Sequence, residues 1–234
     1  MTHLLHVSEV DSTQNYLKAQ FVGLAHGTVV QADIQTAGRG RYDRTWVSHE
    51  GGLYFSVLLK PTKTDFLPNL TQLMALSVCR GLEMLGVHPN LKWPNDVQVD
   101  GRKICGILSE TVFAANKLQA VIMGVGINIE QEGLTHVGQP ATSLKYLHIA
   151  TDKIALLHTI MDFFWRDYDA LISRGFESLR EDYLKRFPAI GKEVTVKNAD
   201  KQICGIAQDI SPRGTLLLQT PQGQQEIYIG DLMV

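Results

Sequence analysis

The chain has 234 residues, a formal net charge of −2 at pH 7 and a sequence pI of about 6.4. Hydrophobic residues make up 44% and charged residues 20%, so the chain can bury a large core, and wholesale disorder is excluded. The charge balance lacks the strongly basic footprint that is typical of nucleic-acid-binding proteins.

The three cysteines, Cys79, Cys105 and Cys204, are widely spaced and form no Cys-x-x-Cys pair. They indicate neither a disulfide framework nor a zinc site, and they fit a reducing cytoplasm. The chain opens with no basic-then-apolar leader, and no apolar run reaches about 18 residues. We therefore expect neither export nor a membrane-spanning segment.

Two short apolar runs, residues 4–7 and 28–33, predict the first strands. Between them, the Asp-Ser-Thr segment 11–13 offers helix-capping side chains ahead of a helix over residues 14–21. Two interpretations of the hydroxyls stay open. They cap the helix only, or they also bind a polar ligand group at the helix N-terminus.

The middle of the chain alternates a helix with strands. Apolar residues at helical spacing predict a helix over residues 69–85, which ends before Gly86. Asp100-Gly101 is a hairpin turn signal, and hairpin-type spacing favours an antiparallel or mixed sheet. The predicted strands are residues 53–59, 91–93, 97–99, 104–110 and 118–125.

Residues 130–140 are polar and contain glycine, which predicts a loop that orders over a ligand. Two amphipathic helices are expected over residues 154–171 and 176–187, separated by residues 173–175. Within the first of these, Phe164 and Trp165 are typical core residues at this spacing.

Beyond Pro188 the pattern becomes β-rich. Turn signals at residues 198–200, 212–214 and 221–223 separate four short runs. This pattern predicts a small β-barrel-like domain, so we place a catalytic domain at residues 1–188 and a C-terminal domain at residues 189–234. The four runs are residues 193–196, 203–207, 215–218 and 226–229.

The segment that carries most chemical information is residues 35–46, in which glycines alternate with arginines after a predicted strand. Glycine lets backbone N–H groups approach a ligand, and arginine supplies forked donors for phosphate or carboxylate. The alternatives are an anion cradle and a solvated basic loop. Trp46, which closes the segment, either packs on the loop or stacks a base.

A second constellation favours the anion cradle. Lys92-Trp93-Pro94-Asn95-Asp96 and Lys103 add cations and one carboxylate beside further turns. Fixed cations suit a transition state that spreads negative charge over phosphate oxygens. The chain contains no Walker A motif, no complete dinucleotide fingerprint and no nucleophile elbow, so covalent catalysis has little support.

Taken together, these segments resemble the biotin protein ligase family, from about residue 5 to the C-terminus. The order and spacing of five motifs carry the resemblance: Asp11-Ser12-Thr13, Gln35 to Arg41 with Trp46, Lys92 to Asp96, Lys103 to Leu108, and Gly124 to Asn128.

The resemblance implies a class II synthetase-like α/β (α+β) catalytic domain with a mixed sheet flanked by helices, and a small SH3-like β-barrel. It also implies a two-step reaction. Biotin and ATP, with Mg²⁺, form biotinyl-5′-AMP, and biotin then passes to a lysine of a biotin carboxyl carrier protein.

Residue roles follow from the same resemblance. Lys103, Arg41 and Arg39 are the implied catalytic residues, and Asp96 is the implied metal ligand. The biotin site would comprise Ser12, Thr13, Gln14, Gln35, Gly38, Arg39, Gly40, Arg41, Lys103, Gly106, Gly124 and Gly126. The nucleotide site would comprise Arg44, Trp46, Asn95, Lys103 and Asn128.

Three positions depart from the family pattern. Tyr42-Asp43 replaces a common Arg-Gly before Arg44, which bears on loop mobility and charge. Gln14-Asn15 inverts a common Asn-Gln order, so the role of Gln14 is open. Ala141 stands where some members place an aromatic residue near adenine, so that stacking is not expected.

We expect a cytoplasmic enzyme that does not bind a membrane. We also expect no DNA binding, because the chain starts directly at the catalytic strand. Both a monomer and a homodimer are compatible with the sequence. The alternatives are a lipoate or octanoyl ligase of related fold and a biotin-binding regulator without turnover. The sequence leaves open which carrier is modified and what the C-terminal domain does: docking the carrier, binding ATP or stabilising the fold.

Overall fold

The computed structural model describes residues 3–134, 139–198 and 201–233. The chain divides into two units, Met1–Thr64 with Gly101–Met161 and Asp65–Asp100 with Asp162–Val234. The predicted loop over residues 130–140 and the turn over 198–200 lie partly outside the described residues. Among the described residues, no helix is both long and apolar enough to cross a membrane.

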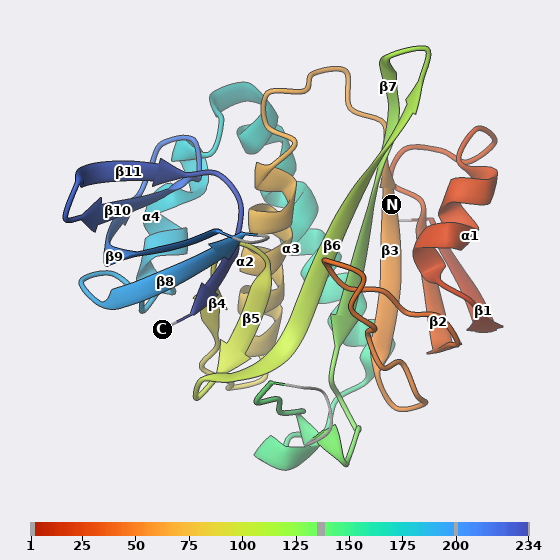
Figure 1. The fold of residues 1–234 in the computed structure, drawn as a ribbon. Helices are drawn as coiled ribbons and strands as arrows, with labels where there is room; N and C mark the ends of the chain where they lie inside the picture. The colour runs from red at the N-terminus through yellow and green to blue at the C-terminus, as the bar shows by residue number, and fades with distance from the viewer. Residues whose placement is uncertain (1–2, 135–138, 199–200, 234) are drawn as a thin grey trace. The chain divides into compact units, whose positions relative to one another are not determined.

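Seven strands form the main sheet: β1 (Leu4–Val10), β2 (Val29–Gln35), β3 (Leu53–Leu59), β4 (Asn90–Lys92), β5 (Asp96–Val99), β6 (Arg102–Ala114) and β7 (Lys117–Ile127). Their order is β1-β2-β3-β7-β6-β5-β4 (Figure 1). β1 and β2 pair in parallel, whereas β2–β3, β3–β7, β6–β7 and β4–β5 are antiparallel. The predicted mixed sheet is confirmed.

The β6–β7 hairpin is longer than the sequence predicts, because both strands continue through exposed positions that lack an apolar run. Ala115 and Asn116 turn the chain with φ of 47° and 61°. Within the paired region Gly106 lies opposite Gly126, and Leu108 lies opposite Gly124. This register brings three of the predicted site glycines onto neighbouring strands.

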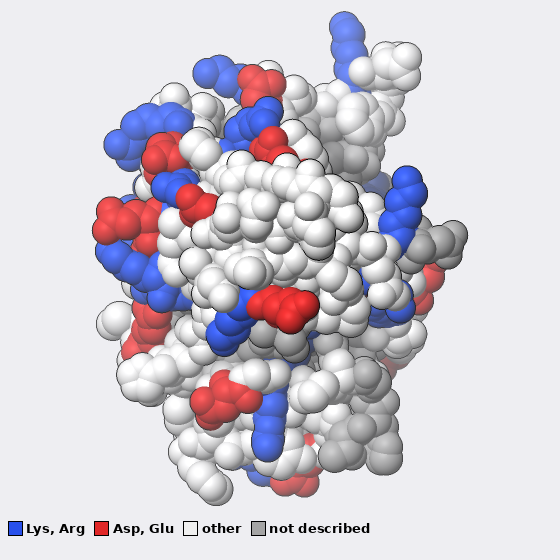
Figure 2. Space-filling model, turned by 60° about the vertical axis from the view of Figure 1, so that its left-hand side comes forward, with Lys and Arg blue, Asp and Glu red and all other residues white. Residues whose placement is uncertain are grey.

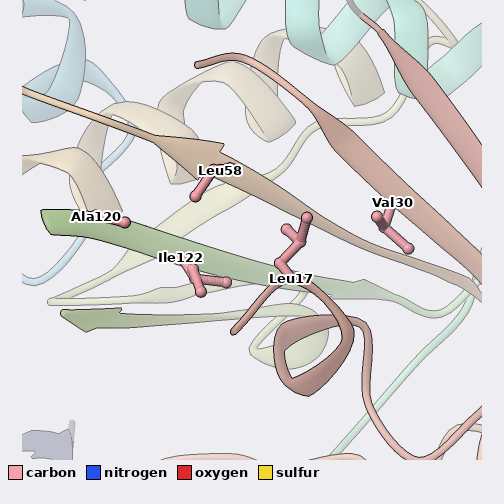
Figure 3. Close-up of a cluster of buried hydrophobic side chains, with 5 residues drawn as sticks. All are labelled: Leu17, Val30, Leu58, Ala120 and Ile122. Atoms are coloured by element: carbon pink, nitrogen blue, oxygen red, sulfur yellow. The ribbon is translucent and has the colours of Figure 1, made fainter. Parts of the chain in front are cut away.

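Helix α1 (Thr13–Gln20) starts at an N-cap, Ser12, whose side chain accepts a hydrogen bond from the Gln14 backbone. The helix buries Leu17 completely against the sheet of the first unit, next to Val30, Leu58 and Ile122 (Figure 3). Burying a leucine side chain contributes roughly 1.5–3 kcal/mol. This packing fixes the N-terminus of α1, where two of the predicted site hydroxyls lie.

The remaining helices are α2 (Asn69–Glu83), α3 (Lys153–Arg174) and α4 (Glu177–Lys185). Phe164 on α3 is fully buried and packs on the rings of Trp165 and Tyr168, which agrees with a core role. Ser173 and Arg174 continue α3 instead of ending it, and Gly175 ends the helix with φ 72°. A left-handed residue is needed there, which glycine adopts without steric cost.

Five antiparallel strands form the C-terminal sheet: β8 (Glu193–Asn198), β9 (Lys201–Ile210), β10 (Leu216–Thr220), β11 (Gly223–Ile227) and β12 (Asp231–Met233). Their order is β11-β10-β9-β8-β12. The sequence predicts four strands. The fifth, β12, is missed because its three residues are too few to show a periodic pattern. Gly223, which the sequence predicts as part of a turn, is the first residue of β11.

On the face shown in Figure 2, acidic and basic side chains are interspersed.

Candidate functional site

The Gly-Arg segment forms a hairpin between Gln35 and Ser48. Its base is closed by a hydrogen bond from the Gln35 amide to the Ser48 carbonyl (3.1 Å), and Trp46 donates to the Gly38 carbonyl (2.9 Å). Near the tip, the Gly40 amide donates to the Arg44 carbonyl (2.7 Å). The two arms therefore hold each other in one register, and the arginines lie along a defined ribbon.

Gly38 has a packing reason within this hairpin. A Cβ at Gly38 would lie 2.4 Å from the Trp46 carbonyl oxygen and 2.6 Å from the Ser48 hydroxyl, which is too close for any side chain. Gly40 is less constrained, because its nearest contact would be 3.4 Å away. Glycine is thus required most strictly at Gly38, where the two arms of the hairpin approach each other closely.

The Trp46 indole lies over a glycine floor on β6 and β7. A Cβ at Gly126 would meet Trp46 Nε1 at 2.3 Å, and one at Gly106 would meet Trp46 Cζ3 at 2.8 Å. Lys103 lies on the same side of the sheet, with Nζ 5.3 Å from the Trp46 ring centroid. A thin apolar group can lie on Gly106 and Gly126 only if the Trp46 indole moves away or stacks on that group.

A polar cluster lies at the N-terminus of α1. Gln35 Oε1 accepts from the Thr13 amide (2.9 Å) and hydroxyl (3.0 Å), and Gln35 Nε2 donates to the Ser48 hydroxyl (2.9 Å). The Thr13 hydroxyl also lies 2.7 Å from the Ser56 hydroxyl. Hydroxyls and a carboxamide with both donors and acceptors match what a neutral, urea-like ring requires.

Ser12 and Gln14, the neighbours of Thr13, make different contacts. Ser12 is buried and its hydroxyl accepts from the Gln14 amide (3.2 Å), so Ser12 caps the helix, as both interpretations require, and ligand binding by Ser12 stays a prediction. The Gln14 carboxamide donates to the Leu108 carbonyl (3.2 Å) and covers Gly124, where a Cβ would come within 2.7 Å of it. Gln14 therefore points into the sheet, and the side chain of its neighbour Asn15 is partly exposed and accepts a hydrogen bond from Arg39.

Tyr42 and Asp43 make the hairpin tip with φ of 55° and 56°. The Tyr42 ring lies 4.9 Å from the Arg41 guanidinium carbon and 5.6 Å from that of Arg44, and Arg41 donates to the Tyr42 hydroxyl (3.0 Å). The departure from the family pattern thus adds an aromatic ring between two cations. Arg39 points the other way, toward α1 and β6.

Lys103 is placed by backbone pairing with the segment around Ala141. Its amide donates to the Pro140 carbonyl (2.9 Å), and the Thr142 amide donates to its carbonyl (2.9 Å). The buried Asn128 side chain donates to the Thr142 carbonyl (2.9 Å). Lys103 on β6 and Asn128, the residue after β7, therefore both bind the chain around Thr142.

Asn95 and Asp96 lie in the second unit, at the turn and first residue of the β4–β5 hairpin, where Lys92 pairs with Asp96. Trp93 in this motif is buried, and its indole donates to the Gly214 carbonyl (3.2 Å). Within the described part of the chain, no group of three or more His, Cys, Asp or Glu side chains converges on a metal position.

All the predicted biotin-site residues lie in the first unit, together with Arg44, Trp46 and Asn128. Sequence reasoning missed Ser48 and Ser56, which complete the polar cluster. It also missed Asn15 and Glu110, which accept hydrogen bonds from Arg39, and Lys18, which pairs with Glu110. Of these residues, only Asn15 could have been found from the sequence, because it follows Asp11 by four residues, the spacing of one helical turn. Glu110 is 71 residues from Arg39.

Comparison with known proteins shows the family of the chain. Residues 7–128 match the Biotin/lipoate A/B protein ligase family, and residues 189–232 match the Biotin protein ligase C terminal domain. The chain is 33% identical to the Bifunctional ligase/repressor BirA of Bacillus spizizenii, covering 98% of this chain and 73% of that protein. It is 29% identical to the Biotin–[acetyl-CoA-carboxylase] ligase of Paracoccus denitrificans, covering 94% and 96%.

Among solved structures, the biotin protein ligase of Aquifex aeolicus in complex with biotin and ATP superimposes with a TM-score of 0.89. It is 32% identical and covers 100% of this chain and 98% of its own. The fold similarity and both domain matches agree. The chain belongs to the biotin/lipoate A/B protein ligase family.

Proposed function

We propose that this protein is a biotin protein ligase that activates biotin with ATP and attaches it to a carrier lysine. The observation that carries the proposal is the site of the first unit. Lys103 and the arginine hairpin face a glycine floor that ends at a polar cluster around Thr13 and Gln35. A relative that is 32% identical over the whole chain is in complex with biotin and ATP.

In the first step, a biotin carboxylate oxygen forms a bond to the α-phosphorus of ATP, and the bond to pyrophosphate breaks. In the second, the acceptor lysine nitrogen forms a bond to the biotinyl carbonyl carbon, AMP leaves, and the amine proton passes to solvent. Both steps gather negative charge on phosphate oxygens, which fixed cations stabilise more in a site shielded from water.

The proposed roles of the residues are those that the family resemblance implies. Ser12, Thr13, Gln14 and Gln35 would hold the biotin ring. Gly106, Gly124 and Gly126 would lie under its tail. Lys103 would bridge the biotin carboxylate and the α-phosphate, with Arg39, Arg41 and the glycines Gly38 and Gly40 on the covering hairpin. Arg44, Trp46, Asn95 and Asn128 would contact the nucleotide.

Mg²⁺ would be held by Asp96. The ion commonly takes one or two carboxylates and completes its shell with substrate phosphates and water, so a single protein carboxylate fits. When bound, it neutralises charge on the phosphate oxygens of ATP. The protein's own cations act on the α-phosphate and the carboxylate.

A lipoate or octanoyl ligase is the main rival, because the matched family includes lipoate enzymes. The match of residues 189–232 to the biotin protein ligase C-terminal domain favours biotin. The carboxamide and hydroxyls at the head of the site also suit a ureido ring better than a dithiolane, which offers no donors.

We further propose a biotin carboxyl carrier protein as the acceptor, a cytoplasmic location and no nucleic-acid partner. Relatives named biotin–[acetyl-CoA-carboxylase] ligase support the acceptor. A net charge of −2 does not favour nucleic acid. Specific retardation of an operator fragment at physiological salt would contradict that last part of the proposal.

ATP–pyrophosphate exchange tests the function directly. Exchange that requires biotin, and is not supported by lipoate, is the expected result, followed by transfer of label to a carrier lysine. Lys103→Ala should slow exchange about 10²-fold or more, because a cation at the reacting groups is lost. The matched control is Arg102→Ala at the exposed neighbouring position of β6.

No exchange in the unaltered protein would refute the ligase and leave a binding regulator. Near-normal exchange in Lys103→Ala, with exchange intact in Arg102→Ala, would remove Lys103 from the mechanism but not refute the function. Exchange supported equally by lipoate would favour the rival enzyme.

A further inference from the structure

Arg39 is engaged in protein contacts that turn it away from the hairpin tip. Its Nη2 donates to Asn15 Oδ1 on α1 (3.0 Å) and to Glu110 Oε2 on β6 (2.9 Å). The hairpin, the first helix and a central strand are therefore joined by one guanidinium. This differs from Arg41 and Arg44, which lie around the ring of Tyr42.

The Asn15 side chain is oriented for this contact. Its Nδ2 donates to Asp11 Oδ2 (2.6 Å), so its carbonyl oxygen is turned toward Arg39. Asp11 Oδ1 in turn accepts from the Ser12 amide (2.7 Å), and hydrogen bonds from Asn15 and the backbone hold the pKa of the Asp11 carboxyl below its usual value. The order Gln14-Asn15 is what places the asparagine on this side of α1.

Glu110 is shared between two cations. Its Oε1 accepts from Lys18 Nζ (2.7 Å), while Oε2 accepts from Arg39. The Glu110 side chain is 22% exposed, compared with 41% for Arg39 and 33% for Lys18, so the carboxylate is the more shielded partner. A charged network spanning three elements constrains geometry more than an isolated surface pair.

Holding Arg39 also holds the opposite arm. Arg39 and Thr45 face each other across the hairpin, and Trp46 donates to the Gly38 carbonyl (2.9 Å). Trp46 in turn lies on Gly106 and Gly126. Glu110 is on β6, the strand that also carries Gly106, four residues away. The hairpin is thus fixed at Arg39 on one arm and at Trp46 on the other.

We propose that Glu110, with Asn15, is a positioning residue that latches Arg39, and that Arg39 acts by fixing the hairpin over the site. This inference rests on the proposed function for its effect on biotinyl-AMP. The cations that face the phosphate are then Arg41, Arg44 and Lys103. Arg39 keeps them in place without touching the nucleotide.

Glu110→Gln is the sharpest test, because it removes the charge and keeps the shape. Loss of the latch should speed dissociation of biotinyl-AMP about two- to fivefold, the upper part of the range for a charged pair of this kind. If Arg39 instead bound the phosphate, releasing it from Glu110 would slow dissociation. Slower or unchanged dissociation therefore overturns the proposal.

Lys18→Gln is the matched control, because Lys18 contacts only the other oxygen of Glu110. We expect dissociation within about twofold of the unaltered protein. An effect as large as that of Glu110→Gln would show that surface charge matters and not the latch, and would overturn the proposal. Combining Arg39→Met with Glu110→Gln should give the effect of Arg39→Met alone, and additive effects would also sink it.

Limited trypsin digestion of the ligand-free chain tests whether Glu110 holds the hairpin, and it does not depend on ligase activity. Cleavage after Arg41 and Arg44, identified by mass spectrometry, should be about two- to fivefold faster in Glu110→Gln at an unchanged melting temperature. Unchanged cleavage overturns the latch. If the unaltered protein shows no pyrophosphate exchange while the hairpin is released in Glu110→Gln, the ligase proposal fails and the latch itself stands.

Discussion

At the scale of single residues, the site depends on the absence of side chains at three points of the sheet. Gly106, Gly124 and Gly126 have no positive φ, so backbone freedom does not explain them. Trp46 and Gln14 occupy the space that a Cβ would take. Glycine in a strand interior is unfavourable by itself, and it is expected where another group must approach the backbone closely.

Gly126→Ala should therefore disturb Trp46 and the site but not the fold. The added Cβ would lie 2.3 Å from Trp46 Nε1, so the indole, which is only partly buried, must shift. We expect biotin affinity, measured by titration calorimetry, to fall about tenfold or more, as for an overpacked site.

Gly23→Ala provides the control, because its Cβ would be 3.9 Å from the nearest atom and its φ is not positive. It should bind biotin as the unaltered protein does. Biotin affinity of Gly126→Ala equal to that of Gly23→Ala would show that the glycine floor is not part of the binding site.

At the scale of elements, an ion cluster joins the helices of the second unit. Arg80 on α2 donates to Asp167 on α3 and to Asp182 on α4, and Arg186 donates to Asp182 and, with two bonds, to Glu83. Burial raises the pKa of the Asp182 carboxyl, but hydrogen bonds from Arg186 and Arg80 outweigh it, and the net shift is downward. Asp167 is shifted the same way.

Because these carboxyls have a lower pKa in the folded than in the unfolded chain, their contribution is complete above the unfolded pKa, near 3.8, and is lost as the pH falls through the folded pKa. Asp182→Asn should lower the free energy of unfolding at pH 7 by about 1–3 kcal/mol, since two half-buried arginines lose a charged acceptor. The difference from the unaltered protein should shrink below about pH 4.

Urea unfolding at several pH values measures this, with Glu181→Gln as control. Glu181 is the next residue, but its side chain is 87% exposed and it pairs only with Lys185. The control should change stability by less than about 0.5 kcal/mol. A difference for Asp182→Asn that is constant from pH 7 to pH 3 would contradict the ionic origin.

At the scale of the whole molecule, the turn at Arg213-Gly214 of the C-terminal sheet binds helix α2 and the motif of residues 92–96, all within the second unit. The Gly214 carbonyl accepts from Gln72 on α2 (2.8 Å) and from the Trp93 indole (3.2 Å), and Asn69 donates to the Arg213 carbonyl (2.9 Å). Trp93 belongs to the same motif as Asp96. This connection favours a stabilising role for the C-terminal domain, among the roles that the sequence leaves open.

Gly214→Ala tests that connection. Gly214 has φ +81°, and a Cβ there would lie 2.3 Å from both Asn69 Nδ2 and Gln72 Oε1. Gly191, in the same sheet domain, has φ +78° and nothing within 4 Å of its Cβ position. Both alanines share the left-handed strain of about 1–2 kcal/mol, and only Gly214→Ala adds a clash and broken hydrogen bonds.

We expect Gly191→Ala to lose about 1–2 kcal/mol of unfolding free energy and Gly214→Ala to lose about 1–3 kcal/mol more, the penalty of leaving buried polar groups unpaired. Thermal or urea unfolding followed by tryptophan fluorescence measures both. Equal losses in the two variants would mean that the turn does not secure the sheet. The boundary at residues 188 and 189 stays a prediction.

Local signals in the sequence were sufficient for most of the elements. The run of residues 53–59 predicted β3 to the residue, and Asp100-Gly101 predicted a turn in which both residues have positive φ, 49° and 72°. The capping segment 11–13 predicted the start of α1 to within one residue, since the helix begins at Thr13 and not at Gln14. These features depend on neighbours within one or two turns of chain, so periodicity, capping chemistry and turn residues determine them. The motifs likewise predicted the family from their order alone.

The tertiary structure decided what depends on residues far apart in the chain. The parallel pairing of β1 with β2, the position of Trp46 on the β6–β7 glycines and the contact of Glu110 with Arg39 leave no local pattern. Their partners are chosen by how strands align and which faces are buried, and those are properties of the packed sheet. The sequence by itself determined which side chains are available for the chemistry, and the packed sheet determined which of them meet.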